Sequence, residues 1–303
     1  MKKSVSFKNS NFMMAGNLYL PENVDENKKY PAIVVTHPGG GVKEQAAGLY
    51  ADKLSKEGFI TLAFDASHQG ESGGEPRFLE DPTARVEDIR CAIDYLSTLS
   101  YVDAERIGAL GICAGGGYTV NAALTEKRIK AVAGVSAVDI GAFFRGDGIE
   151  GSTQRNIATL KDVGAQRSAE ANGAEPMYTS YVPNSLEEID ENTMVLLREG
   201  YDYYRTPRAQ HPNSTNQLLL RSFDRIIAFT AFDQVGTLLT QPLLLIAGKD
   251  ADTRGFSEQA YEMANCEKEL YLIDGATHIA LYDIPDNVDE AVGKLKEFFG
   301  KNL

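Results

Sequence analysis

The sequence of 303 residues predicts an α/β fold, in which a doubly wound and mostly parallel sheet carries a helical insertion between two strands. Two observations support this prediction. Short runs that are apolar on both faces and rich in β-branched residues alternate with segments of helical periodicity. One long interval contains no such run, and about a hundred residues without a strand cannot form a single loop in a compact domain.

Six apolar runs mark the predicted parallel strands: residues 32–36, 60–64, 106–112, 131–135, 243–247 and 269–273. Two segments have an apolar stripe at helical spacing, formed by Val86, Ile89, Ile93 and Leu96 in one and by Val288, Ala291, Val292, Leu295 and Phe298 in the other. The N-terminal stretches 5–7 and 13–20 predict an antiparallel hairpin on one sheet edge. The alternation of strands and helices favours a doubly wound sheet.

The interval without strands sets the expected domain organisation. Residues 1–138 and 242–303 form the predicted α/β core, and residues 139–241 form an inserted helical cap. Helical patterns occur at 194–198 and 218–232 within this cap. Five aromatic residues of the cap suggest an aromatic-lined pocket: Phe143, Phe144, Tyr201, Tyr203 and Tyr204.

Composition excludes several classes of partner. The net charge of −13 disfavours binding to nucleic acid and to anionic membrane surfaces. No apolar stretch is long enough to span a bilayer, and no apolar segment follows Met1-Lys2-Lys3 as in a secretory signal. The three cysteines are far apart and lack metal-ligand spacing, so we expect a cytoplasmic protein without disulfides, metal or cofactor. The expected partner is a small-molecule acyl substrate, and homo-oligomerisation is left open.

The strongest chemical signal is Gly111-Ile112-Cys113-Ala114-Gly115, which closes the third predicted parallel strand and opens a helix of small residues. This is the nucleophile elbow G-x-S-x-G with cysteine in the serine position. The glycines allow a tight approach of strand and helix, and the helix N-terminus would lower the thiol pKa. The alternative is a buried cysteine in a glycine-rich turn. The position between strand and helix favours a nucleophile at Cys113.

Two downstream loops supply candidates for the base and the acid. His278 follows the last predicted strand, in the place and chain order of the catalytic histidine of a nucleophile-elbow enzyme. Asp250 and Asp252 follow the preceding strand, where an acid would orient the imidazole. We favour Asp250 from its loop position and keep Asp252 as the alternative acid. Either carboxylate could instead cap the next helix.

An oxyanion hole requires backbone N–H donors beside the nucleophile. The amide of Ala114 is one expected donor, and Gly40 or Gly41 of the loop His37-Pro38-Gly39-Gly40-Gly41 is the other.

Three further residues are candidates for the pocket. His37 begins this glycine-rich loop. Glu44 follows it and could hold the thiol protonated at rest, although a glutamate there is more often the exposed first turn of a helix. His68 lies in the loop after the second parallel strand, where a structural turn is the favoured role.

The elbow 111–118, the His-Pro-Gly-Gly-Gly loop, the segment 64–74 and the Ala-Thr-His loop together resemble dienelactone-hydrolase-like α/β-hydrolases. That resemblance covers most of the chain and implies the α/β-hydrolase fold with a triad of Cys113, Asp250 and His278. The predicted cap departs from the shorter dienelactone hydrolases and is closer to capped hydrolases and acyltransferases. The lactone substrate is therefore not implied.

These residues predict a cysteine hydrolase of small carboxylic esters, lactones or thioesters that works through an acyl-enzyme. An acyltransferase with the same triad is the first alternative. A ligand-binding protein that kept the fold and lost the chemistry is the second. A redox-sensing thiol ranks last, because no other cysteine is close to Cys113 in sequence.

Overall fold

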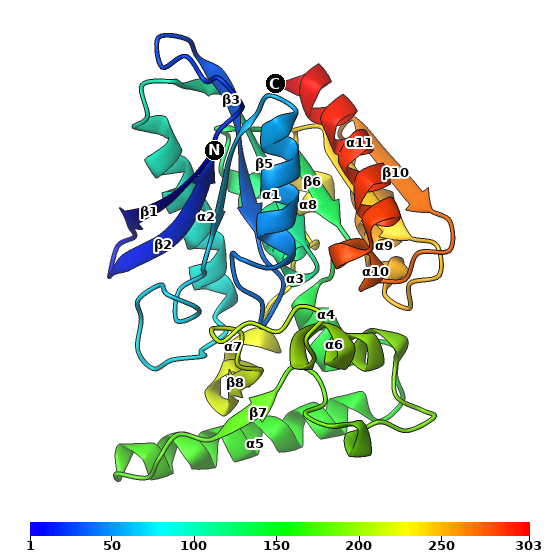
Figure 1. Ribbon diagram of the computed structural model, residues 1–303. Coiled ribbons are helices and arrows are strands. Elements are labelled where there is room, and N and C mark those ends of the chain that lie inside the picture. The colour runs from blue at the N-terminus through cyan, green and yellow to red at the C-terminus, as the bar shows by residue number, and fades with distance from the viewer.

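The computed structural model describes residues 1–303 and contains an eight-stranded sheet (Figure 1). The strand order across the sheet is β1-β2-β4-β3-β5-β6-β9-β10. The strands are β1 (Lys2–Lys8), β2 (Met13–Tyr19), β3 (Tyr30–Thr36), β4 (Ile60–Phe64), β5 (Val102–Ile112), β6 (Ile129–Val135), β9 (Leu243–Gly248) and β10 (Lys268–Ile273). The two N-terminal strands are antiparallel and the other six are parallel. The predicted edge hairpin and all six predicted parallel strands are therefore confirmed.

Both faces of the sheet are covered by helices, which confirms the predicted fold class. The helices α2 (Pro82–Ser97), α3 (Ala114–Thr125), α8 (Val235–Leu238) and α9 (Arg254–Met263) contribute to the core on one face. The helices α1 (Ala46–Lys56), α10 (Ala280–Asp283) and α11 (Pro285–Asn302) contribute to the core on the other.

Alternating residues of the central strand β3 show why its sequence is apolar throughout. Ala32 and Val34 belong to one core, and Ile33 and Val35 belong to the other. This is the pattern expected for a parallel strand that is buried on both faces. The apolar stripes predicted from sequence lie in α2 and α11 and are buried as expected.

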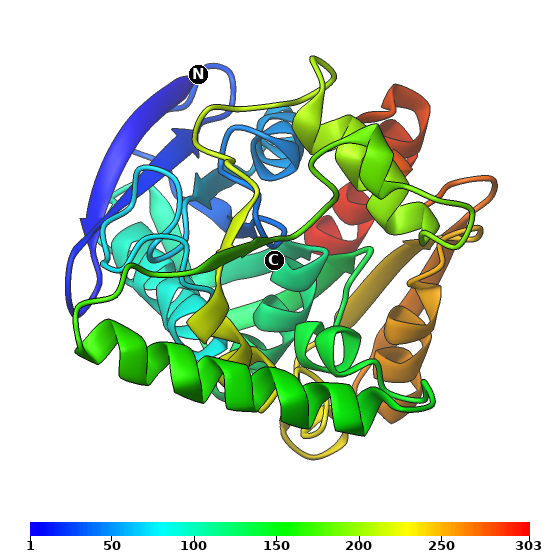
Figure 2. The same cartoon turned by 90° about the horizontal axis from the view of Figure 1, so that it is seen from below.

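The insertion, defined as residues 139–241, connects β6 to β9. It contains α4 (Ile140–Arg145), α5 (Ser152–Ala171), β7 (Tyr178–Ser180), η1 (Leu186–Glu188), α6 (Val195–Arg205), β8 (Gln217–Leu219), η2 (Leu220–Ser222), α7 (Phe223–Ile226) and α8. The expected helix at 194–198 lies at the start of α6. The expected helix at 218–232 is wrong in part, because its first residues pair as β8 with β7. Figures 1 and 2 show most of the insertion lying across the end of the sheet toward which the parallel strands point.

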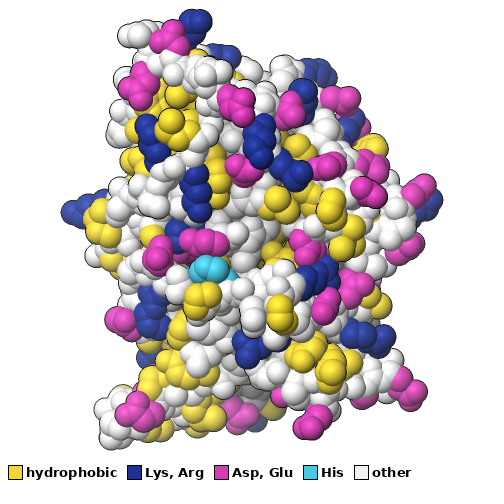
Figure 3. Space-filling view, in the orientation of Figure 1, with side chains coloured by type: hydrophobic (Ala, Val, Ile, Leu, Met, Phe, Trp, Pro, Cys, Tyr) yellow, Lys and Arg dark blue, Asp and Glu magenta, His cyan; other side chains and the backbone are white.

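The helices and surface add two facts about the molecule. None of the helices combines the length and the apolar composition that a bilayer crossing requires. On the face shown in Figure 3, lysines and arginines are interspersed with aspartates and glutamates.

Candidate active site

Cys113 lies in a strained turn between β5 and α3. Its backbone has φ +57° and ψ −124°, a conformation that a residue with a side chain rarely adopts. Such strain costs about 1–3 kcal/mol and persists only where the surroundings enforce it. Here the enforcing contacts come from close backbone approaches. A Cβ on Gly115 would lie 2.5 Å from the carbonyl oxygen of Thr36, and a Cβ on Gly111 would overlap the Gly115 carbonyl.

The amides of Ala114 and Gly39 face the sulfur of Cys113 and favour its anionic form. Gly39 also lines the pocket above the sulfur. An oxyanion hole requires N–H donors beside the nucleophile, and these two amides are the candidates for that role. Ala114 is the donor expected from the sequence, whereas Gly39 stands in place of the expected Gly40 or Gly41.

Local structure explains why Gly39, and not Gly40 or Gly41, faces the thiol. The amide of Gly41 is already bonded to the carbonyl of Pro38 at 3.2 Å, which closes the turn. Gly40 occupies the apex with φ +70°, and the ring of Tyr181 covers it so closely that a Cβ there would lie 2.7 Å from the ring. The sequence showed three consecutive glycines, and the turn decides which of them faces the thiol.

His37 and the buried Arg85 hold this loop in place. One His37 ring nitrogen contacts the Pro38 carbonyl at 2.6 Å, and the other accepts the Ala66 amide at 3.1 Å. The guanidinium of Arg85 donates to the His37 carbonyl at 2.6 Å. Burial and the charge of Arg85 lower the pKa of His37 well below its usual value, so the ring is neutral. His37 therefore anchors the loop 37–41 and does not line the pocket.

A second buried network connects this anchor to the pocket wall. Glu80 accepts hydrogen bonds from the hydroxyls of Tyr118 at 2.6 Å and Tyr181 at 2.9 Å. Its carboxylate lies 3.6 Å from the guanidinium of Arg85. The ring of Tyr181 thus covers the glycine loop, and its hydroxyl is held by the hydrogen bond to Glu80.

The other two candidate pocket residues lie elsewhere. Glu44 pairs with the ammonium group of Lys43 at 2.7 Å, and that buried lysine also binds Asp65 and Glu71. His68 has φ +68°, and its ring contacts the Pro76 carbonyl. Neither residue lines the pocket above Cys113. The favoured structural turn at His68 agrees with this geometry, and the suggestion that Glu44 approaches the thiol is wrong.

His278 is buried, but the partner of its Nδ1 is not a carboxylate. Its Nδ1 contacts the hydroxyl of Thr253 at 2.5 Å. Asp250 and Asp252 are both exposed, and neither side chain contacts the imidazole. Asp252 instead accepts the amide of Leu196 at 3.0 Å, at the N-terminus of α6, where a carboxylate interacts favourably with the helix dipole. The expectation of an aspartate beside His278 is therefore not met, and Thr253 occupies that place.

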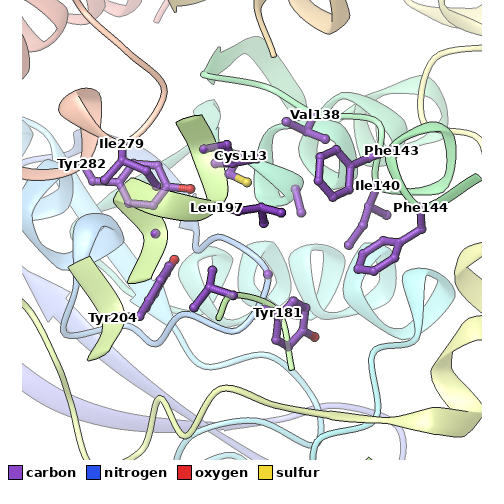
Figure 4. Close-up of a pocket in the computed structure, with 15 residues that line it drawn as sticks. Cys113, Val138, Ile140, Phe143, Phe144, Tyr181, Leu197, Tyr204, Ile279 and Tyr282 are labelled. Atoms are coloured by element: carbon purple, nitrogen blue, oxygen red, sulfur yellow. The ribbon is translucent and has the colours of Figure 1, made fainter. Parts of the chain in front are cut away.

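Tyr282 lies between the candidate base and the candidate nucleophile. Nε2 of His278 contacts the Tyr282 hydroxyl at 3.1 Å, and no direct hydrogen bond joins His278 to Cys113. Figure 4 shows the Tyr282 hydroxyl pointing toward the sulfur, and hydrogen bonding from this hydroxyl favours the thiolate. Tyr282 lies in α10, four residues after His278, which belongs to the turn before that helix.

Burial dominates the ionisation of these groups. It raises the pKa of the Cys113 thiol, and the opposing effects of Tyr282 and of the Ala114 and Gly39 amides reduce this rise only in part. Burial also lowers the pKa of His278 to about 3. Both groups are therefore neutral at pH 7. The expected lowering of the thiol pKa by the helix N-terminus is outweighed, and a resting thiolate–imidazolium pair is disfavoured.

An apolar pocket opens above Cys113 (Figure 4). Its empty volume, including the mouth, is about 550 Å³, and thirteen of its fifteen lining residues are hydrophobic. Besides Gly39, Cys113 and Ala114, it is lined by Val138, Ile140, Phe143, Phe144, Tyr181, Val182, Leu196, Leu197, Gly200, Tyr204, Ile279 and Tyr282. The insertion thus supplies most of the wall. Of the five aromatic residues suggested from sequence, Phe143, Phe144 and Tyr204 line the pocket and Tyr201 and Tyr203 do not.

Sequence reasoning did not identify Gly39, Thr253 and Tyr282. Gly39 was within the recognised loop, so only the turn geometry was missing. Tyr282 has no comparable signal, because His278 lies in the turn before α10 and the two residues do not share a helix face. Nothing in the sequence distinguishes Thr253 from the two aspartates that precede it.

Comparison with known proteins identifies the family. Residues 14–139 match the Dienelactone hydrolase family. Protein YcjY of Escherichia coli K12 is 45% identical over 307 residues, with all of both chains covered. The chain belongs to the dienelactone hydrolase family. Another relative, thiohydrolase aneE of Aspergillus aculeatus, is 31% identical over 242 residues, which covers 78% of this chain and 73% of the relative.

Solved structures support the fold assignment of this dienelactone hydrolase family member. The crystal structure of protein PA2218 from Pseudomonas aeruginosa has a TM-score of 0.90 at 36% identity, covering 100% of this chain and 94% of that one. The α/β hydrolase GrgF from a Penicillium species has a TM-score of 0.83 at 19% identity, covering 100% and 99%. The chain therefore has the α/β-hydrolase fold, and its family supports a hydrolase.

Proposed function

We propose that this protein is a hydrolase that uses Cys113 to cleave thioesters, activated esters or lactones of apolar acids through an acyl-enzyme. The observation that carries the proposal is the placement of a cysteine on a strained elbow, beneath an apolar pocket and against two amides. A cysteine that served only packing would not require this backbone.

The pocket lining favours an uncharged and apolar acyl group. Phe143, Phe144 and Leu197 surround the space above the sulfur, and no lining residue carries a formal charge at pH 7. A carboxylate or ammonium group would lose its hydration there without a partner, which costs several kcal/mol. We therefore treat the insertion as a cap that selects the acyl chain.

The ionisation of the site favours substrates with good leaving groups. With a pKa of about 3, His278 is a weak proton acceptor, and it lacks a carboxylate to stabilise its charged form. A thiolate or an activated alkoxide can leave without much proton donation, whereas an amine cannot. Thioesters are thus preferred over amides, and the name thiohydrolase of the relative aneE agrees with this preference.

The reaction would proceed in two halves. His278 takes the proton of Cys113, and the sulfur attacks the carbonyl carbon while the amides of Ala114 and Gly39 bind the oxyanion. The tetrahedral intermediate expels the thiol or alcohol, which receives the proton from His278. Water then loses a proton to His278 and attacks the acyl-enzyme, and Cys113 leaves and recovers its proton.

The test uses S-acyl-N-acetylcysteamine thioesters and p-nitrophenyl esters of increasing chain length, with intact-mass detection of the acyl-enzyme. Cys113→Ala should lose turnover by more than about 10³-fold and lose the adduct. Cys266→Ala is the matched control, since Cys266 is equally half-buried but lies outside the pocket. Full activity in Cys113→Ala would show that the proposed mechanism is wrong.

The same assay separates the two alternatives. An acyltransferase would transfer the acyl group to an added alcohol or amine in preference to water, a behaviour that a buried apolar site favours. A binding protein would be stabilised against heat by the acid or ester, without turnover and without an adduct at Cys113.

A further inference from the structure

The route of the proton from Cys113 is not explained by a direct contact with His278. The only partners of the imidazole are Thr253 at Nδ1 and Tyr282 at Nε2. The Tyr282 hydroxyl contacts Nε2 of the imidazole at 3.1 Å. Figure 4 shows the same hydroxyl pointing toward the sulfur of Cys113. The groups thus form one chain, from the thiol through a phenol to an imidazole.

We propose that Tyr282 is a catalytic residue that relays the proton between the thiol of Cys113 and Nε2 of His278. This inference rests on the proposed function and adds to it the path of the proton. In the His278 tautomer that carries its proton on Nδ1, Nδ1–H donates to Thr253 and Nε2 is an acceptor. The phenol of Tyr282 then donates to Nε2, and the thiol of Cys113 donates to the phenol oxygen. All three groups are then satisfied in their neutral forms.

The relay balances in each half-reaction. As the sulfur attacks the acyl carbon, its proton moves to the phenol oxygen while the phenol proton moves to Nε2. As the leaving group departs, the phenol gives it a proton and takes one from the imidazolium. Water and then the departing Cys113 sulfur use the same path in the second half. Tyr282 ends each step as a neutral phenol.

The surroundings of Tyr282 suit a fixed relay. Its ring makes edge contacts with Tyr203 and Tyr204, with centroids 5.2 and 6.4 Å apart, and it lies 5.5 Å from the His278 ring. Burial raises its pKa well above the usual value, and Cys113, Tyr204 and Tyr203 raise it further. The phenol therefore passes a proton on and does not rest as a phenolate.

The experiment compares Tyr282→Phe with the wild type by measuring the single-turnover acylation rate from pH 5 to 9. The wild-type rate should change little across this range, because His278 stays neutral down to a pKa of about 3. Without the phenol the thiol must ionise to solvent. We therefore expect Tyr282→Phe to acylate about 10²–10⁴-fold more slowly at pH 6 and to gain about tenfold per pH unit.

Tyr101→Phe is the matched control, because Tyr101 is a buried tyrosine in the core on the other face of the sheet and does not line the pocket. It should keep the wild-type rate and pH profile. A wild-type rate in Tyr282→Phe, or a slower rate with an unchanged pH profile, would overturn the relay. These outcomes leave the loss of adduct in Cys113→Ala untouched, so the relay and the proposed function can fail separately.

A second variant guards against misfolding of Tyr282→Phe. His278→Asn removes the end of the same path and should show the same dependence on pH. The double variant should be no slower than the slower single variant, because both substitutions interrupt one series of transfers. If the rate losses of the two single variants multiplied in the double variant, Tyr282 and His278 would act independently, and this would overturn the relay.

Discussion

The two sides of the candidate site differ in how they are built. On the nucleophile side, backbone geometry fixes Cys113, Ala114 and Gly39, and the constraints are steric. On the histidine side, side chains make the contacts, from Thr253 through His278 to Tyr282. The nucleophile side keeps the pattern of a nucleophile elbow. On the histidine side, the hydroxyl of Thr253 takes the place of the expected carboxylate, and the phenol of Tyr282 contacts Nε2 of His278.

This difference bears on what each side tolerates. A glycine whose Cβ would meet a backbone carbonyl cannot be replaced without moving a strand or a helix. A hydrogen-bond partner can be replaced by another group of suitable reach, with a change in pKa but not in fold. Substitutions on the first side should therefore affect folding, and those on the second should affect rate.

The largest effect is expected from Gly115→Ala. The new Cβ would lie 2.5 Å from the Thr36 carbonyl and 2.6 Å from the His37 carbonyl, and neither backbone segment can move freely within the buried core. We expect at least about 3 kcal/mol of destabilisation, measured by urea unfolding.

The control for this prediction is Gly164→Ala on the exposed side of α5, where nothing lies within 4 Å of an added Cβ. It should stabilise the protein by up to about 1 kcal/mol. Equal stabilities for the two variants would show that the elbow is less constrained than its contacts indicate.

The next largest effect is expected at Thr253. Thr253→Val removes the partner of Nδ1 and leaves a buried donor unpaired, so kcat should fall about 10- to 100-fold with little change in KM. Thr253→Asp should raise the pKa of His278 and speed the cleavage of esters with poorer leaving groups.

Asp250→Asn distinguishes this arrangement from the triad expected from sequence. Because Asp250 is exposed and does not contact His278, its neutralisation should change kcat less than twofold. A loss of 100-fold in Asp250→Asn, with full activity in Thr253→Val, would restore the aspartate to the site.

The contrast between the two sides also explains what could be predicted. The strands were predictable because a buried parallel strand must be apolar on both faces, as β3 is. The elbow was predictable because Gly111 and Gly115 are required where a Cβ would collide with a neighbouring backbone carbonyl. The partner of His278 was not, because Asp250, Asp252 and Thr253 share one short loop, and which of them turns inward depends on the contact of Asp252 with α6.

The absence of main-sheet strands between β6 and β9 was predictable, whereas the elements inside the insertion were not. A missing strand pattern marks its boundaries, whereas short elements such as β7 and β8 carry too few residues for a periodic signal. Its role in the pocket can be tested at Leu197, which faces the space above Cys113.

Leu197→Trp should fill part of the pocket. We expect kcat/KM to fall about tenfold for long acyl chains and to change little for acetyl substrates, since a pocket discriminates by the volume that it offers. Val195→Trp on the same helix is exposed and outside the pocket, so it should leave the preference for chain length unchanged. A uniform loss with all chain lengths in Leu197→Trp would contradict a pocket for the acyl chain.

The last prediction concerns acid stability on the histidine side. The folded protein lowers the pKa of His278 to about 3, so between that pH and the usual value of 6.5 the unfolded chain binds one more proton at this residue. Stability must therefore fall as pH falls through this window, by about 1.4 kcal/mol per pH unit for each such histidine. The buried, neutral His37 adds a second proton in the same direction. His278→Asn should lower the slope of unfolding free energy against pH by about one proton between pH 6 and 4, as measured by urea unfolding at several pH values. An unchanged slope would mean that the imidazole is charged in the folded protein, and a charged His278 could not accept the proton of Cys113.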